Sequence, residues 1–231
     1  MPLLGGDLRT RIAHEWTTLP WNVTVGRLAV AGGHEVYADP AGPVSGDPVT
    51  SPSVAPGALT TRAALQDSHL LAAPVAALLD TWAHAAQVLV APIDPAQADT
   101  ASLAEAYGVP LSASANCVVV GGRRAGVERV AACVVLATTR ADVNGVVKRW
   151  LDVRKASFLP MERAVVLTGM EYGGITPVGL PPDWELLVDP AVVAAPEVVV
   201  GSGVRHSKLV LPGALLALLP GAHVVEGLGR G

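Results

Sequence analysis

Two glycine-rich turns contain the residues of this sequence whose types and spacing best suit chemistry. Residues 168–181 read TGMEYGGITPVGLP, and residues 198–208 read VVVGSGVRHSK. Glycine has no side chain to hold a ligand away from the backbone, and proline fixes the direction in which a turn ends. Paired backbone N–H groups of this kind stabilise the oxyanions that form in acyl transfer. The two turns therefore predict a small pocket lined by backbone groups, with Gly173, Gly174 and Pro177 of the first turn and Gly201, Ser202 and Gly203 of the second as its candidate residues.

The motifs of other catalytic classes are missing. The sequence has no GxxxxGK[ST] phosphate loop, no GxGxxG at the start of a helix and no GxSxG nucleophile elbow. Its six histidines lack the HxxxH and HxH spacings of metal sites, and its two cysteines, Cys117 and Cys133, lack CxxC spacing. We therefore predict no metal and no cofactor and interpret both cysteines as reduced thiols. His206, beside the second turn, is the acid–base candidate.

Positive charge gathers in one segment of an acidic chain. The 231 residues have a formal net charge of −4, which argues against general coating of nucleic acid. Residues 121–163 nevertheless contain nine lysines and arginines against four acids, among them Arg123, Arg124 and Lys155. Two interpretations stay open: a solvated hairpin turn and helix face, or a landing surface for a polyanion such as RNA.

The elements that must position these residues follow from periodicity and caps. Hydrophobic repeats with flanking Pro or Gly predict helices over 68–86, 94–108, 141–153, 160–169 and 213–219. Apolar, β-branched runs predict strands over 88–93, 185–189, 197–203, 208–212 and 223–227, and a hairpin over 115–138 with its turn near residue 125. Helices and strands alternate without a regular βαβ rhythm, so we expect an α+β domain built on a mixed sheet.

The N-terminal part of the chain differs from the rest. Residues 39–57 are rich in Pro, Gly and Ser and have no hydrophobic period, which is typical of a flexible linker. The segment before them offers one short strand candidate, within 23–33. We therefore divide the chain into an extension, 1–66, which is flexible or follows a translation start placed too far upstream, and a domain, 67–231. No run of 18 apolar residues and no signal peptide is present, which predicts a cytoplasmic protein.

The two glycine turns, together with the RKASF segment before them, resemble the YbaK/EbsC family of aminoacyl-tRNA deacylases, which is related to the editing domain of bacterial prolyl-tRNA synthetase. The similarity runs from about residue 88 to 227, and GGITP is its most specific block. The resemblance implies an α+β editing fold, with a mixed, largely antiparallel sheet or barrel-like core and surrounding helices. It also implies trans-editing, the hydrolysis of a small amino acid from mischarged tRNA for proline or a similar tRNA. The implied partners are tRNA and an aminoacyl-tRNA synthetase.

The same resemblance assigns roles to residues. It implies that the loop 173–177 walls the aminoacyl pocket, which adds Ile175 and Thr176 to the substrate-binding set, and that the backbones of Gly174 and Ser202 position the scissile carbonyl. The family places an essential lysine early on the first hairpin strand, where this chain has Asn116. An amide donates a hydrogen bond but brings no positive charge. Asn116 is therefore the third catalytic candidate, and the charge is expected at Lys155 or Lys208, unless the protein binds without cleaving.

Two other functions stay open. The first is a non-catalytic module that binds RNA or aminoacyl-tRNA, and the second is a protein that binds a small molecule in the same pocket, because fold alone does not determine function. Deacylation of mischarged tRNAs would separate the enzyme from the binding module. Absence of tRNA binding at low salt would favour the small-molecule protein.

Overall fold

The computed structural model describes residues 14–18, 24–29, 35–38 and 56–231 of a chain that forms two compact units, Met1–Val44 and Ser45–Gly231. In the first unit an antiparallel sheet has the order β1 (His14–Thr18), β2 (Thr24–Ala29) and β3 (Glu35–Ala38). The strand expected within 23–33 is β2, and its two partners were not predicted. Most of the expected linker lies outside the described residues, and the domain boundary after residue 66 stays a prediction.

The second unit contains a five-stranded mixed sheet in the order β13-β10-β7-β6-β9. Its centre is the predicted hairpin, with β6 (Ala115–Arg124) antiparallel to β7 (Val127–Leu136). The turn residues Ala125 and Gly126 have φ of 49° and 82°, the left-handed conformation that two-residue hairpin turns require. The remaining strands are β10 (Glu185–Val188) and β13 (Ala222–Val224), which run parallel to their neighbours, and β9 (Ala156–Phe158), which is antiparallel to β6.

A four-stranded antiparallel sheet lies at the other end of the hairpin. Its order is β11-β12-β5-β4, with β11 (Val198–Gly201), β12 (Ser207–Leu211), β5 (Leu89–Pro92) and β4 (Arg62–Ala63). A parallel bridge between Ser114 and Val199 sets the start of β6 beside β11. Leu59 is buried, and Ala58 donates its N–H to the Tyr107 carbonyl at 2.7 Å, so packing of this unit begins before the expected start at residue 67.

Short helices cover both sheets, and two predicted helices are broken. The range 68–86 contains α1 (Ala73–Leu79) between two 3₁₀ turns. The range 94–108 is split because two aspartates act as caps: Asp94 accepts from Ala96 at the 3₁₀ turn η4 (Pro95–Gln97), and Asp99 accepts from Ser102 at the start of α2 (Thr100–Tyr107). The other helices are α3 (Lys148–Trp150), which continues a π-helical turn η6 (Val143–Val147), α4 (Met161–Thr168) and α5 (Pro190–Val193), and the segment η7 (Gly213–Leu218) is 3₁₀ rather than α.

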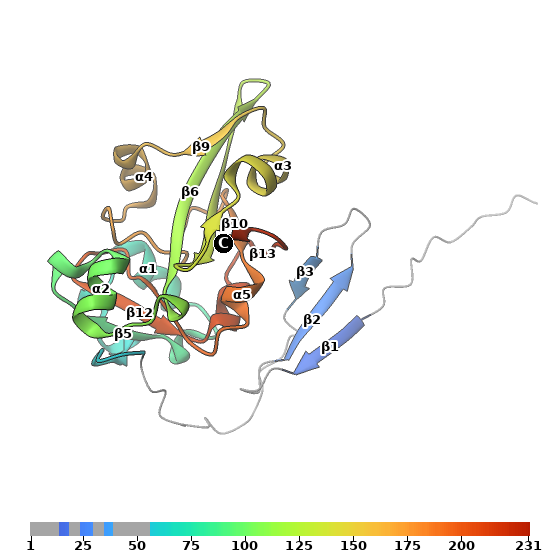
Figure 1. Cartoon of the computed structure of the whole chain (residues 1–231). Helices are drawn as coiled ribbons and strands as arrows, with labels where there is room; N and C mark the ends of the chain where they lie inside the picture. The colour runs from blue at the N-terminus through green and yellow to red at the C-terminus, as the bar shows by residue number, and fades with distance from the viewer. Residues whose placement is uncertain (1–13, 19–23, 30–34, 39–55) are drawn as a thin grey trace, which may run out of the picture. The chain divides into compact units, whose positions relative to one another are not determined.

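Figure 1 shows how these elements are arranged within the second unit. Strand β6 reaches from the region of α1, α2, β5 and β12 at its lower end to β9, α3 and α4 at its upper end. One buried cluster, including Val120, Cys133 and Leu187, packs η6 against the five-stranded sheet, and another, including Leu103 and Val210, packs α2 against the four-stranded sheet. Neither sheet closes into a barrel within the described residues, and the α+β prediction is confirmed. No helix in the described part has the length and apolarity needed to cross a bilayer.

Candidate functional site

The two glycine turns pack directly against each other. Gly203 donates its N–H to the Gly174 carbonyl, and Glu171 donates its N–H to the Gly203 carbonyl, both at 2.8 Å. A Cβ atom on Gly174 would lie 2.6 Å from the Val204 carbonyl oxygen, and one on Gly201 would lie 2.7 Å from the Ile175 oxygen. Backbone of one turn thus occupies the space that a side chain of the other would need. This close approach explains why both positions are glycine.

Arg205 holds the crossed turns together. Its backbone N–H donates to the Glu171 carboxylate at 2.7 Å, and its guanidinium donates to the carbonyls of Tyr172 at 3.2 Å and Pro95 at 2.8 Å. The side chain therefore joins the first glycine turn to the 3₁₀ turn before α2. Sequence reasoning did not single out Arg205, because its acceptors are backbone carbonyls far away along the chain. Tyr172 itself is 60% exposed.

Strand pairing and the start of α2 bring Asn116 and Lys208 to the same part of the molecule. Gly201 pairs with Lys208, and Lys208 pairs with Ala91 on β5. The parallel bridge between Ser114 and Val199 places the start of β6, which includes Asn116, beside β11. Side chains in one row point to the same face of a sheet. Lys208 therefore lies beside Gly201 on the face where the first glycine turn crosses it.

The start of α2 covers both side chains. The Thr100 hydroxyl donates to Asn116 Oδ1 at 2.8 Å, and Lys208 Nζ donates to the Ala98 carbonyl at 2.6 Å. Since Oδ1 is the acceptor, the Asn116 Nδ2 amino group is the part of the amide that is free for a further acceptor among the described residues. Burial lowers the pKa of Lys208 from 10.5 to about 8, with help from the positive charge of Arg205, while Asp99 acts in the opposite direction.

Three other residues expected in the pocket, Gly174, Ser202 and Thr176, differ in their hydrogen bonds and burial. The Gly174 N–H donates to the Glu171 carbonyl at 2.9 Å, so it can meet a substrate only if that bond opens. The Ser202 hydroxyl is fully buried and lies 2.7 Å from the Ser207 hydroxyl. Thr176 is also fully buried, and its hydroxyl has no hydrogen-bond partner among the described residues. A buried hydroxyl without a partner marks a place for a ligand or a water molecule. Their predicted roles stay predictions.

The basic residues lie elsewhere. Arg123, Arg124 and Lys155 are exposed at the turn end of the hairpin, where the Lys155 carbonyl lies against Gly122. Arg124 forms an ion pair with Asp152. Seven residues of strand separate Arg123 from Asn116, roughly 20–25 Å at about 3.3 Å per residue. The structure thus brings together the glycine turns, Asn116 and Lys208, and it keeps the basic end of the hairpin apart from them.

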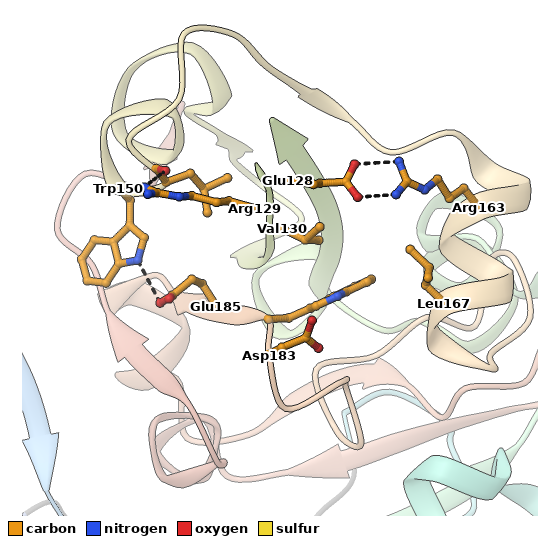
Figure 2. A pocket seen from close by; sticks show the side chains of 10 residues that line it. Glu128, Arg129, Val130, Trp150, Arg163, Leu167, Asp183 and Glu185 are labelled. Atoms are coloured by element: carbon orange, nitrogen blue, oxygen red, sulfur yellow. Dashed lines mark hydrogen bonds and ion pairs between the residues drawn. The ribbon is translucent and has the colours of Figure 1, made fainter. Parts of the chain in front are cut away.

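A cavity of about 360 Å³ lies away from the glycine turns, between the five-stranded sheet and α4. Figure 2 shows the Glu128–Arg163 ion pair on one side of it and Trp150 on the other, where the Trp150 indole donates to the Glu185 carboxylate at 3.1 Å. None of its lining residues belongs to the predicted site, and no motif in the sequence pointed to it. The backbone-lined crossing carries the better case for chemistry because ester hydrolysis needs fixed donors rather than volume.

Comparison with solved structures supports the assignment of this chain to the α+β editing fold. A crystal structure of a hypothetical protein is 26% identical, with a TM-score of 0.54, and the match covers 61% of this chain and 90% of that chain. A candidate trans-editing enzyme for prolyl tRNA synthetase is 23% identical, with a TM-score of 0.59, over 69% of this chain and 97% of that chain. A scaffold protein used for epitope backbone grafting is 24% identical, with a TM-score of 0.57 and the same coverage.

Family membership rests on a sequence match over residues 94–218. No curated protein is similar enough to the chain to be matched with it. The family described as the aminoacyl-tRNA editing domain matches residues 94–218, more than half of the chain, and this range contains both glycine turns, Asn116 and Lys208. The resemblance drawn from the GGITP block is thereby confirmed. The chain belongs to the aminoacyl-tRNA editing domain family.

Proposed function

We propose that the protein is a trans-editing deacylase that hydrolyses the ester bond of mischarged aminoacyl-tRNA. The substrate we propose is a small amino acid on tRNA for proline or a similar tRNA. Membership of the editing family supports the reaction class. The observation that carries the proposal is the crossing of the two glycine turns beside Asn116. There, backbone groups of the two turns lie at contact distance, and the start of β6, which carries Asn116, lies beside β11.

The proposed reaction is direct attack of water on the aminoacyl ester. Thr100 holds Asn116 Oδ1, which leaves the Nδ2 group to donate to the ester carbonyl or to orient the attacking water. The second glycine turn, at Ser202, positions the carbonyl, and the 2′-hydroxyl of the terminal ribose assists. One water is consumed, and the products are the free amino acid and tRNA with its 3′-hydroxyl restored. No metal or organic cofactor takes part in this scheme.

Selection by size follows from the same crossing. The loop 173–177 packs on the second turn at backbone contact distance, so this wall of the proposed site cannot move back to admit a large aminoacyl side chain without breaking that contact. Exclusion of a larger amino acid by a rigid wall discriminates more strongly than loss of one methylene contact, which is worth about 1–3 kcal/mol. We propose that a correctly charged, bulkier amino acid is rejected in this way. Delivery by a synthetase and action in the cytoplasm belong to the same proposal.

A panel of mischarged tRNAs tests the function. Purified protein is incubated with alanyl-tRNA and cysteinyl-tRNA for proline and with correctly charged prolyl-tRNA, and the remaining ester is measured against the spontaneous rate. Faster loss of at least one mischarged species, with prolyl-tRNA spared, is the expected result. Spontaneous rates for every species in the panel would contradict the proposal.

A non-catalytic aminoacyl-tRNA-binding module is the second candidate. The observation in its favour is that the Gly174 N–H and carbonyl are both used within the turns, which leaves fewer donors for an oxyanion. This module would bind mischarged and uncharged tRNA in a salt-dependent manner and would protect the ester instead of cleaving it. A protein that binds neither form at low salt would favour the small-molecule alternative.

A further inference from the structure

Lys208 is a lysine in an apolar strand at the centre of a sheet. It lies on β12, between β11 and β5, and only 7% of its surface is exposed. Its neighbours on the strand, Leu209 and Val210, are fully buried. Lysine is almost never buried without a partner, because removing an ammonium from water is costly. A position of this kind calls for a reason beyond packing.

The described residues accept only one of the three hydrogen bonds that the Lys208 ammonium can donate. Of its three N–H donors, one reaches the Ala98 carbonyl at 2.6 Å. No carboxylate among the described residues forms an ion pair with Lys208, and the nearby Asp99 carboxylate is held by the backbone N–H and hydroxyl of Ser102. Two donors of a buried cation are therefore left for a group that the protein does not supply. Lys155, the other lysine considered for a charge at the site, is exposed at the far end of the hairpin.

The position of Lys208 indicates what that group is. Lys208 pairs with Gly201, and the first glycine turn crosses Gly201 on the face to which Lys208 points. The start of α2 contacts both Lys208, through the Ala98 carbonyl, and Asn116, through the Thr100 hydroxyl. We propose that Lys208 is a catalytic residue whose ammonium binds the ester carbonyl oxygen and stabilises the negative charge that develops on it. This inference rests on the proposed deacylase function and deepens it. Asn116 then orients the attacking water.

The step balances without a further reactant. The water oxygen bonds to the carbonyl carbon, and the carbonyl electron pair moves to the oxygen held by Lys208. When that pair returns, the bond to the ribose 3′-oxygen breaks, and the leaving oxygen takes a proton derived from the attacking water. Lys208 donates hydrogen bonds throughout and gives up no proton. A fixed donor aimed at an oxyanion in a site shielded from water contributes roughly 100-fold to 1000-fold in rate.

If Lys208 is catalytic, its protonation state should determine how the deacylation rate depends on pH. Its pKa is lowered to about 8 by burial and by Arg205, against the attraction of Asp99. Strands β5 and β11, which pack on either side, carry no titratable side chain. Because only the ammonium form stabilises an oxyanion, activity should decline as pH rises through about 8.

Three variants of the full chain test the inference on the mischarged tRNA that the parent cleaves fastest. Lys208→Met removes the charge at similar length, Lys208→Arg keeps a cation, and Arg62→Met, on the exposed side chain of β4, controls for loss of a positive charge. Spontaneous hydrolysis is subtracted at each pH. We expect Lys208→Met to lower kcat roughly 100-fold or more with KM within about threefold, since the lost interaction forms in the transition state. Its alkaline decline should vanish, and Lys208→Arg should shift that decline to higher pH.

The outcomes separate this inference from the proposed function. Circular dichroism and the thermal midpoint establish that Lys208→Met folds, and the midpoint should stay or rise because a buried charge has been removed. An active parent that Lys208→Met matches in kcat would overturn the inference alone. The same holds if the alkaline decline persists in Lys208→Met. A parent that leaves every mischarged tRNA intact would overturn the proposed function, and the role of Lys208 with it.

Discussion

Gly201→Ala is the sharpest test of the crossed turns. A Cβ atom there would overlap the Gly174 carbonyl oxygen and come within 2.7 Å of the Ile175 oxygen. These are backbone atoms, so no flexible side chain can give way, and one turn must shift. The backbone of Gly201 lies outside the left-handed region, so alanine can adopt its conformation. Without a clash, alanine would stabilise the folded protein by about 0.4–1 kcal/mol because it lowers the conformational entropy of the unfolded chain. Any loss of stability therefore reports the clash.

The magnitude follows from two terms. Forcing an extra methyl into a packed site costs typically 1–3 kcal/mol, and opening the Gly203–Gly174 hydrogen bond costs about 0.5–1.5 kcal/mol. After the gain of about 0.4–1 kcal/mol through the unfolded state is subtracted, we expect a net loss of about 1–4 kcal/mol, or a fall of roughly 2–16 °C in the unfolding midpoint of a domain of this size. Deacylation should fall with it, because the crossing forms the site.

Gly227→Ala is the matched control for this substitution. Gly227 has a φ of 69° and nothing within 4 Å of its Cβ position. Alanine there should therefore lower the stability only by the cost of a left-handed backbone conformation, about 1 kcal/mol. Urea unfolding followed by circular dichroism compares both variants with the parent. If Gly201→Ala is as stable as the parent, or loses no more than Gly227→Ala, the turns do not cross as described.

The remaining predictions concern the amide, the basic hairpin end and the boundary of the domain. Asn116→Ala should slow deacylation by roughly 100-fold while affinity for tRNA stays nearly constant, and Asn116→Lys should keep or raise activity; an Asn116→Ala protein with the parent's rate would make the amide structural. Charge reversal at Arg123 and Arg124 should weaken tRNA binding and flatten its salt dependence, as measured by filter binding from 50 to about 200 mM salt; unchanged affinity would identify a solvated face. A chain of residues 55–231 should fold and retain activity, whereas residues 67–231 lack β4 and a buried leucine and should unfold about 2–3 kcal/mol more easily in urea; equal midpoints would support the predicted boundary after residue 66.

Local signals in the sequence predicted local structure well. Gly169 ends α4 in the left-handed conformation that its position after an apolar repeat indicated, and the hairpin turns at Ala125 as expected. The two broken helices show where such signals compete. The repeat over 94–108 continues through Asp99, but this residue caps a new helix by accepting from the Ser102 N–H. The hydrophobic period of a sequence reveals the apolar face of a helix, but it does not reveal an N-cap residue that ends one helical turn and starts another.

The long-range pairing of strands could not be predicted from the sequence, for a physical reason. The contact of Lys208 with Ala98 joins residues 110 positions apart, and the bridge between Ser114 and Val199 joins the residue before β6 to a strand of the other sheet. Apolar runs such as β5 and β12 carry the same pattern and do not specify which run pairs with which. The glycine turns could be identified as a pair, but their crossing, and the lysine beside it, depend on pairings that only the folded chain defines.

The strand order of the four-stranded sheet also has a consequence for how the protein is made. Strand β5 pairs with β12, which is synthesised more than a hundred residues later. At about 5–20 residues per second, the ribosome needs roughly 5–25 s to cover that distance. During this interval β5 has only the two residues of β4 as a partner, and a ribbon of that size is not stable in water. The nascent chain therefore exposes an apolar strand edge until β12 has been synthesised. A chain released early at a stop codon before residue 207 would lack the whole of β12, and with it Lys208 and the centre of the four-stranded sheet.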